Sequence, residues 1–194
     1  MKKYLTLNIN QKITKDLKTI NTGALVVGCH EGKNLNDTLK ELDLASDGLI
    51  KKLTKRGEIS GKAGHGLYIP SLQGIKSERV YVLGCGKKGK RLPKEKILEV
   101  LKKFVEASKS CKAASTVLVI PSLKPEGEDE SWVMQQLGVL AESSMYVYET
   151  KLGKKDITNH KLKRISISFD ILNVINHQFY IFYIRFLKVK LVGI

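Results

Sequence analysis

Apolar runs bounded by glycine, proline or charged residues predict a series of β-strands. They are Tyr4–Ile9, Gly23–Gly28, Gly66–Ile69, Arg79–Leu83, Thr116–Ile120 and residues 165–169. In the first and the last of these segments apolar and polar positions alternate, which is the period of a strand. In Gly23–Gly28 and Thr116–Ile120 the apolar residues are nearly continuous, as is typical of strands buried on both faces of a sheet.

Between these segments, apolar residues recur at helical spacing in three stretches. They are residues 35–53, 97–105 and 130–148. Either Asn34 or Asn36 can act as N-cap of the first helix, and Gly57 and Gly61 follow its end. Pro93 fits the first turn of the second helix, where a missing N–H costs little. The third helix follows the polar loop 121–129.

Strands that alternate with amphipathic helices predict an α/β sandwich with a mixed, mostly buried sheet. With 194 residues the chain is long enough for one domain and a short tail. We therefore expect one domain over residues 1–169 and a divergent hydrophobic tail over 170–194.

The chain is strongly basic, with 34 Lys and Arg against 19 Asp and Glu and a net charge of +15. Such an excess can indicate binding to nucleic acid. However, lysines occur in nearly every segment, and the two local concentrations lack the interleaved aromatic residues that stack on bases. These concentrations are Lys87, Lys88, Lys90, Arg91, Lys94 and Lys96, and then Lys151, Lys154, Lys155, Lys161, Lys163 and Arg164. Solvated loops are the favoured interpretation, and nucleic-acid binding is the alternative.

Cysteine and histidine residues give no catalytic or metal-binding pattern. Cys29, Cys85 and Cys111 are far apart without CxxC spacing, which indicates a reduced, intracellular compartment. Cys29 and Cys85 each end an apolar run and are expected to be buried. The four histidines show no metal-ligand spacing. Cys29 and His30 are neighbours in a strand, so their side chains point to opposite faces. We expect no catalytic residue, no metal ligand and no bound cofactor in this chain.

No segment reads as a signal peptide or a membrane span.

One segment resembles a ligand-binding loop. The strand that starts at Arg79 leads into Gly84, Gly86 and Lys87, which resembles half of a dinucleotide fingerprint. In such loops the backbone approaches a phosphate closely, near a helix N-terminus. The third glycine is missing from its place, and the next helix begins only near Pro93. We favour a tight turn that needs glycine for positive φ, and keep the ligand loop as the alternative.

Three ordered segments carry a resemblance to a known family. They are Ser46-Asp47-Gly48-Leu49-Ile50, the run from Arg56 to Gly64 that reads Arg-Gly-Glu-Ile-Ser-Gly-Lys-Ala-Gly, and the run from Glu78 to Lys87. They match a helix with an Asp-Gly break, a Gly-Glu…Gly-Lys-x-Gly turn, and a Glu-Arg-Val strand that ends in Gly-x-Gly-Lys. In this order and spacing the chain resembles the N-terminal domain of the leucyl (cytosolic) aminopeptidase family over roughly residues 1–169.

The resemblance implies a fold related to macro domains, a three-layer sandwich with a mostly parallel sheet. Family members are cytoplasmic, generally hexameric metallo-aminopeptidases that use two divalent metals, commonly zinc or manganese. Their metal ligands and catalytic residues lie in a C-terminal domain, and the Asn-Thr-Asp-Ala-Glu-Gly-Arg segment of that domain does not occur here. The chain is therefore expected to be a truncated relative without activity of its own.

The same resemblance suggests partners. The N-terminal domain of the family supports the hexamer, so copies of this chain or full-length aminopeptidase subunits are the expected partners. Some bacterial members also bind DNA. The alternative function is a macro-like binding module for a nucleotide or nucleic acid, with Gly84, Gly86 and Lys87 at the ligand.

The tail departs from the family after Asp170. Residues 171–194 are rich in Ile, Phe and Tyr, and the apolar run Phe179–Ile184 is too short to span a membrane. A frameshift, a missed splice or a premature gene end is the preferred explanation of this tail. An edge strand that closes the sheet is the alternative.

Overall fold

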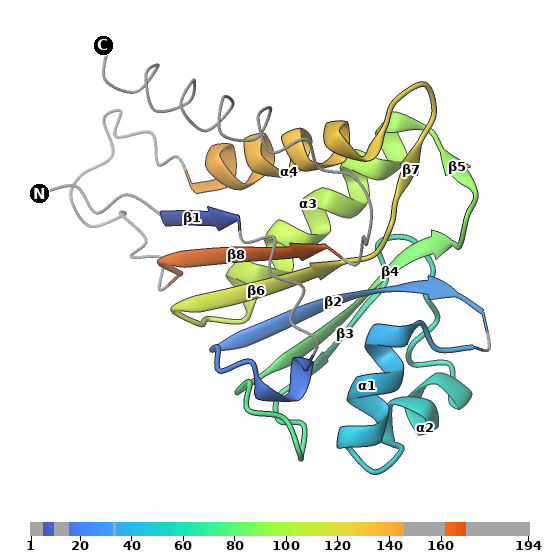
Figure 1. Ribbon diagram of the computed structural model, residues 1–194, viewed down its shortest axis with the longest axis vertical. Helices are drawn as coiled ribbons and strands as arrows, with labels where there is room; N and C mark the ends of the chain where they lie inside the picture. Colours follow the sequence, from blue (N-terminus) through green and yellow to red (C-terminus); the bar gives the residue numbers. More distant parts are fainter. Residues whose placement is uncertain (1–5, 10–15, 33, 146–161, 170–194) are drawn as a thin grey trace, which may run out of the picture.

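The computed structural model describes residues 6–9, 16–32, 34–145 and 162–169. Its main feature is a six-stranded sheet in the order β1-β8-β6-β2-β4-β3 (Figure 1). All neighbouring strands are parallel except β3, which runs antiparallel to β4 at one edge. The strands are β1 (Thr6–Ile9), β2 (Ala24–Glu31), β3 (Gly66–Ile69), β4 (Val80–Lys87), β6 (Ser115–Ile120) and β8 (Arg164–Phe169).

Helices cover both faces of this sheet (Figure 1). One face carries α1 (Asp37–Ala45) and α2 (Leu49–Lys55), and the other carries α3 (Lys94–Ser110) and α4 (Glu130–Met145). A short 3-10 helix, η1 (Leu17–Thr19), precedes β2. The three-layer α/β architecture with a mixed, mostly parallel sheet is the predicted fold class, and the structure confirms it.

Strand β2 shows why the central strands are apolar throughout. Leu25 and Val27 are fully buried in the core on the α1 and α2 side. Val26, between them, is fully buried in the second core, where it belongs to the same cluster as Leu101 and Phe104 of α3. Both faces of the strand are covered from Ala24 to Cys29, and this part carries no polar side chain, whereas the partly buried His30 and Glu31 follow at its end.

The prediction of one helix over residues 35–53 from leucine spacing was wrong, because the structure has two helices. The Asp-Gly break that the family resemblance implied is confirmed. The chain turns between α1 and α2 through Asp47 and Gly48, which have left-handed φ values of 52° and 78°. The Gly48 N–H donates to Asp43 O at 2.9 Å and closes this turn. The leucine spacing continues across the break because both helices pack on the same core.

Asn36, rather than Asn34, is the N-cap of α1. Its side chain accepts a hydrogen bond from the Leu39 N–H at 3.1 Å, and its Nδ2 donates to Gly28 O at 3.0 Å. Pro93 is the N-cap of α3 and so lies one residue before the predicted first turn. Its carbonyl accepts from the Ile97 N–H at 3.2 Å.

Two short strands were missed in the sequence. β5 (Arg91–Leu92) and β7 (Lys124–Pro125) pair in parallel as a separate two-stranded sheet. The sequence predicted residues 121–129 as a polar loop without a strand. The pairing joins the segment that leads into α3 to the segment that leads into α4.

The predicted helix end at Tyr148, the second basic concentration up to Lys161 and the tail 170–194 lie outside the described residues. The boundaries 1–169 and 170–194 stay a prediction. The strand predicted at 165–169 is confirmed as β8, and the described part of the first strand is β1.

Candidate functional site

The predicted ligand loop lies in the second half of strand β4. The prediction ended the strand at Leu83, but β4 continues through Gly84, Gly86 and Lys87. It stays paired with β2 as far as Glu31 and Lys87, with an irregular register after Cys29. The glycines therefore lie at the carboxyl ends of two central parallel strands, where ligands of α/β proteins commonly bind.

At this end of the sheet, the segment 59–65 lies directly against the glycines. A Cβ atom on Gly84 would be 2.0 Å from Lys62 O. A Cβ atom on Gly61, whose φ is +70°, would be 2.3 Å from His30 O. Distances this short leave no room for any side chain, so glycine at both positions is explained by contact between two backbone segments of the protein.

The amide groups of this site are already in use. The Gly84 N–H donates to His65 O at 2.7 Å, and the Gly86 N–H donates to Gly61 O at 2.9 Å. Phosphate-binding loops present such N–H groups to the ligand instead. Gly86 has a φ of +82°, the conformation that the favoured interpretation as a turn requires.

The space beside Gly28 in β2 is filled by side chains from other segments. A Cβ atom on Gly28 would lie 2.3 Å from Pro121 Cδ, 2.9 Å from Cys85 Sγ and 3.0 Å from Phe104 Cζ. Position 28 is therefore occupied by glycine because side chains of three other residues fill the space where its Cβ would lie. The carboxyl end of the central strands is a packed region in the described part of the chain.

Basic side chains surround this closed end. Lys87, Lys88 and Lys90 are exposed. Lys94 pairs with Glu128 at 2.7 Å, and its Nζ lies 5.8 Å from the centre of the Trp132 ring. The first basic concentration is thus largely a solvated surface, as favoured from the sequence. Of the second, Lys163 and Arg164 are described and both are exposed.

His30 is a titratable residue beside Gly86 at the carboxyl end of β2 and β4. Its Nδ1 lies 3.2 Å from Gly86 O. Partial burial lowers the pKa of His30, and the charge of nearby Lys88 lowers it further. Burial thus favours the neutral form of the imidazole, which contacts β4 through Gly86 O.

The predicted burial of Cys29 and Cys85 is confirmed, and Cys111 is buried as well. Cys29, Cys85 and Cys111 are free and buried. Burial raises the pKa of the Cys29 thiol to about 12 and also raises the pKa of Cys85 and Cys111. Thiols with raised pKa values are poor nucleophiles and poor metal ligands.

Neither a metal cluster nor a membrane helix occurs in the described ranges. No three His, Cys, Asp or Glu side chains there lie close enough together to hold a metal ion. No helix in the same ranges is long and apolar enough to cross a bilayer.

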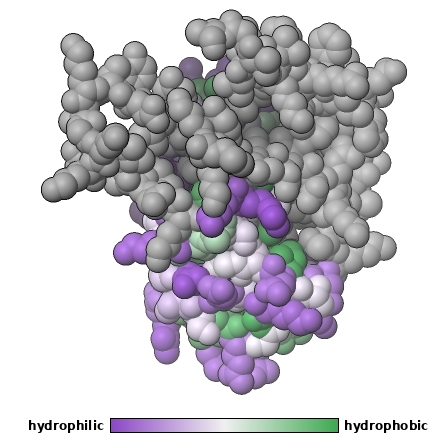
Figure 2. Space-filling view, turned by 90° about the vertical axis from the view of Figure 1, so that its left-hand side faces the viewer, coloured by the Kyte–Doolittle hydropathy of each residue, from purple (hydrophilic) through white to green (hydrophobic). Residues whose placement is uncertain are grey.

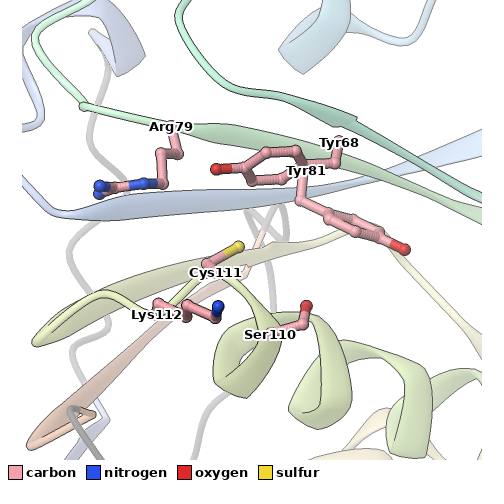
Figure 3. Close-up of a pocket in the computed structure, with 6 residues that line it drawn as sticks. All are labelled: Tyr68, Arg79, Tyr81, Ser110, Cys111 and Lys112. Carbon is pink, nitrogen blue, oxygen red and sulfur yellow. The ribbon is translucent and has the colours of Figure 1, made fainter.

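A cavity at the opposite, amino end of the sheet was missed in the sequence. It has a volume of about 560 Å³ and is lined by Tyr68, Arg79, Tyr81, Ser110, Cys111 and Lys112 (Figure 3). These residues come from β3, the start of β4 and the end of α3, and no short motif joins them. Figure 2 views the molecule from the side at which the parallel strands begin, where hydrophilic residues surround smaller apolar areas on the coloured surface.

Solved structures with the same architecture define the fold class as macrodomain-like. A variant of the Oceanobacillus iheyensis macrodomain has a TM-score of 0.59 at 11% identity, over 97% of this chain and 93% of that one. The macrodomain of Mycobacterium tuberculosis DarG has a TM-score of 0.56 at 15% identity, over 86% of this chain and 98% of that one. A variant of tomato leucine aminopeptidase has a TM-score of 0.56 at 14% identity, over 85% of this chain and 32% of that one.

Sequence comparison then shows the family. Residues 26–155 match the N-terminal domain of the cytosol aminopeptidase family. A probable cytosol aminopeptidase of Nitrosococcus oceani is 32% identical over 149 residues, which cover 77% of this chain and 30% of that protein. One of Tolumonas auensis is 29% identical over 74% of this chain and 29% of that protein. The chain belongs to the cytosol aminopeptidase family, a metallopeptidase family, and the resemblance seen in the sequence is confirmed.

The chain spans about 30% of the length of these curated relatives. Its matched region corresponds to their N-terminal domain.

Proposed function

We propose that this chain acts as the non-catalytic N-terminal domain of a cytoplasmic aminopeptidase and supports the assembly of its subunits. The observation that carries the proposal is the family match over residues 26–155, which contains both helical layers and four strands of the main sheet. The relatives that share this region are named as probable cytosol aminopeptidases.

The proposed reaction of the assembled enzyme is release of the N-terminal amino acid from a peptide. Two divalent metals, zinc or manganese, would act in the part of the relatives that this chain does not span. There they would activate a water molecule and polarise the scissile carbonyl. The contribution of this chain would be to hold subunits in place, because its matched region corresponds to the N-terminal domain of the relatives.

The proposed partners are further copies of this chain or full-length aminopeptidase subunits. Co-expression of the tagged chain with a full-length aminopeptidase of the same organism tests this directly. We expect the two to co-purify, and light scattering of the complex to give a mass of several subunits. A tagged chain that elutes alone, with the full-length enzyme untouched, would contradict the assembly role.

A separate assay tests the non-catalytic role. The purified chain is incubated with leucine p-nitroanilide and manganese, and its rate is compared with a metal-free blank. We expect no difference between the two. Metal-dependent turnover that follows the chain through purification would show that the proposal is wrong.

A role of Gly84, Gly86 and Lys87 in ligand binding stays a prediction. A macrodomain-like fold alone does not establish a ligand, because one fold carries many functions. The Gly84 and Gly86 amides donate to His65 O and Gly61 O, so only the exposed Lys87 side chain is free of this packing. Titration with ADP-ribose and with duplex DNA at two salt concentrations separates the two ligands, because only DNA binding should fall steeply with salt.

A further inference from the structure

We propose that the cavity at the amino end of β4 binds a small aromatic monocarboxylate. Its volume of about 560 Å³ is in the range of small-molecule sites. The cavity combines two aromatic rings with two cationic side chains (Figure 3), and Tyr81 in its wall lies three residues before Gly84 on β4.

The aromatic wall consists of Tyr68 and Tyr81. These residues are directly opposite each other in the β3–β4 pair and therefore project from the same face of the sheet. Their ring centroids are 6.5 Å apart with a tilt of 51°. A Cβ atom on Gly66 would be 2.3 Å from Tyr81 Cε1, so the Tyr81 ring is held against the strand. Tyr68 remains 43% exposed and offers its ring to a planar ligand.

The charge of the cavity favours an anion. Arg79 and Lys112 contribute two positive charges, and Glu78, which pairs with Arg79, contributes one negative charge. The local balance is therefore one positive charge. A monocarboxylate neutralises it, whereas a dianion would overcompensate.

Arg79 keeps donors available for that carboxylate. Its Nη1 donates to Glu78 and, at 3.2 Å, to Gly23 O. A guanidinium has five N–H groups, so the bonds to Glu78, Gly23 O and the Tyr68 hydroxyl do not use all of its donors. Figure 3 shows the Tyr68 hydroxyl directed toward this guanidinium, which joins the aromatic and cationic parts of the site.

Lys112 has an unusual backbone for its residue type. It follows the end of α3 with a φ of +50°, at a helix terminus where glycine or asparagine is the common choice. Its exposed side chain forms no ion pair within the described ranges. Among the described residues, the Lys112 ammonium is therefore left without an ion pair at the edge of the cavity.

A purely structural role of these cations at the helix end is the competing explanation, because cations stabilise helix C-termini. However, the last carbonyls of α3 have internal donors. Ala107 O accepts from the Cys111 N–H at 3.1 Å and from Ser110 Oγ at 3.0 Å, and Lys109 O accepts from the Lys112 N–H at 3.3 Å. The Lys112 ammonium is thus not needed to satisfy these carbonyls.

Titration of the full chain with benzoate, followed by backbone amide chemical shifts, tests the proposal. We expect saturable shifts in the millimolar range at Tyr81, Lys112 and their neighbours. Benzamide keeps the ring without the charge, and acetate keeps the charge without the ring. Each should bind about tenfold more weakly than benzoate, because it loses one of the two contributions.

Two variants of Lys112 separate binding from folding. Lys112→Gln should weaken benzoate about tenfold. Lys112→Gly should weaken it equally while raising the unfolding midpoint, because glycine adopts the left-handed backbone without strain. Lys52→Gln, on the exposed side of α2, is the matched control and should leave affinity unchanged.

Three results would overturn the proposal. They are the absence of a saturable shift with millimolar benzoate, equal affinity for benzamide, and full benzoate affinity in Lys112→Gly. Arg79→Gln serves as a second binding variant, with its fold checked by the same amide spectrum.

Discussion

At the carboxyl end of the main sheet, the sequence has a motif but the structure is packed. At the amino end, the sequence has no motif but the structure has a cavity. The carboxyl end carries the glycine pattern that resembles a ligand loop, yet Gly84 and Gly61 are in contact with the protein's own backbone. The amino end carries no motif, yet it has an open cavity of about 560 Å³. A glycine pattern shows that something approaches the backbone closely, and it does not show that the approaching group is a ligand.

The physical cause of the difference lies in what covers each end. At the carboxyl end, the segment 59–65 and Pro121 pack onto the strands. At the amino end, α3 packs on β2 and β4 and ends at Ser110. The edge strand β3 therefore keeps Tyr68 exposed beside the end of this helix.

Gly84→Ala should give the largest effect on this comparison. The new Cβ would lie 2.0 Å from Lys62 O, and backbone cannot move away as a flexible side chain can. We expect the free energy of unfolding to fall by about 3 kcal/mol in urea titrations. Gly138→Ala is the control, because its Cβ meets nothing within 4 Å and lies inside α4. It should raise stability by roughly 0.5–1 kcal/mol. A mild effect of Gly84→Ala would show that the carboxyl end is open.

Asn36→Ala should have the next largest effect. It removes the N-cap bond to Leu39 and the bond from Nδ2 to Gly28 O, which together connect α1 to the carboxyl end of β2. We expect a loss of about 2 kcal/mol in the same measurement. Asn34→Ala, at an exposed position two residues earlier, should change stability by less than about 0.5 kcal/mol. Equal effects of the two substitutions would mean that the cap is assigned to the wrong asparagine.

Acidification should produce the smallest effect, through His30. Its folded-state pKa lies below the ordinary 6.5, mainly because of burial. As the pH falls through 6.5 toward that lower value, the unfolded chain takes up the proton first, so stability decreases. His30→Asn keeps a donor near Gly86 O and removes the titration.

The free energy of unfolding is measured for the wild type and for His30→Asn on both sides of that pH window. The difference between their two pH dependences gives the contribution of His30. Burial is the main cause of the raised pKa of Glu41. Above pH 4.5 this carboxyl makes stability decrease as the pH rises, which is opposite in sign to the effect of His30 and is the same in both proteins. An identical pH dependence of the two proteins would show that His30 is not buried at the junction.

Most of the fold was visible in the sequence, because the pattern of apolar residues reflects burial directly. The continuous apolar stretches correctly predicted β2 and β6, which are covered on both faces. The break at Asp47 and Gly48 was not predicted from spacing, because α1 and α2 turn their leucines toward one core. The strands β5 and β7 have two residues each, too few for any periodicity.

The site was less visible than the fold. The Gly84–Lys87 segment was found from its glycines, but its close partner is 59–65, which sequence alone did not connect to it. Tyr68, Arg79 and Lys112 lie on three separate elements, so only the antiparallel return of β3 and the end of α3 bring them together. Lys112 had one detectable signal, a lysine directly after a helix, and that signal is too common to indicate a site.

The central claim is that Gly84 and Gly86 pack against segment 59–65 and do not form an open ligand site. Hydrogen exchange at the amides of Gly84 and Gly86 tests this claim most directly. The structure predicts slow exchange, because both N–H groups donate to protein carbonyls, at 2.7 and 2.9 Å. Gly89, which is exposed, should exchange rapidly and serves as the internal reference. ADP-ribose should leave all three rates unchanged. Rapid exchange at Gly84 and Gly86 that becomes slow when ADP-ribose is added would contradict this account and establish the loop as a ligand site.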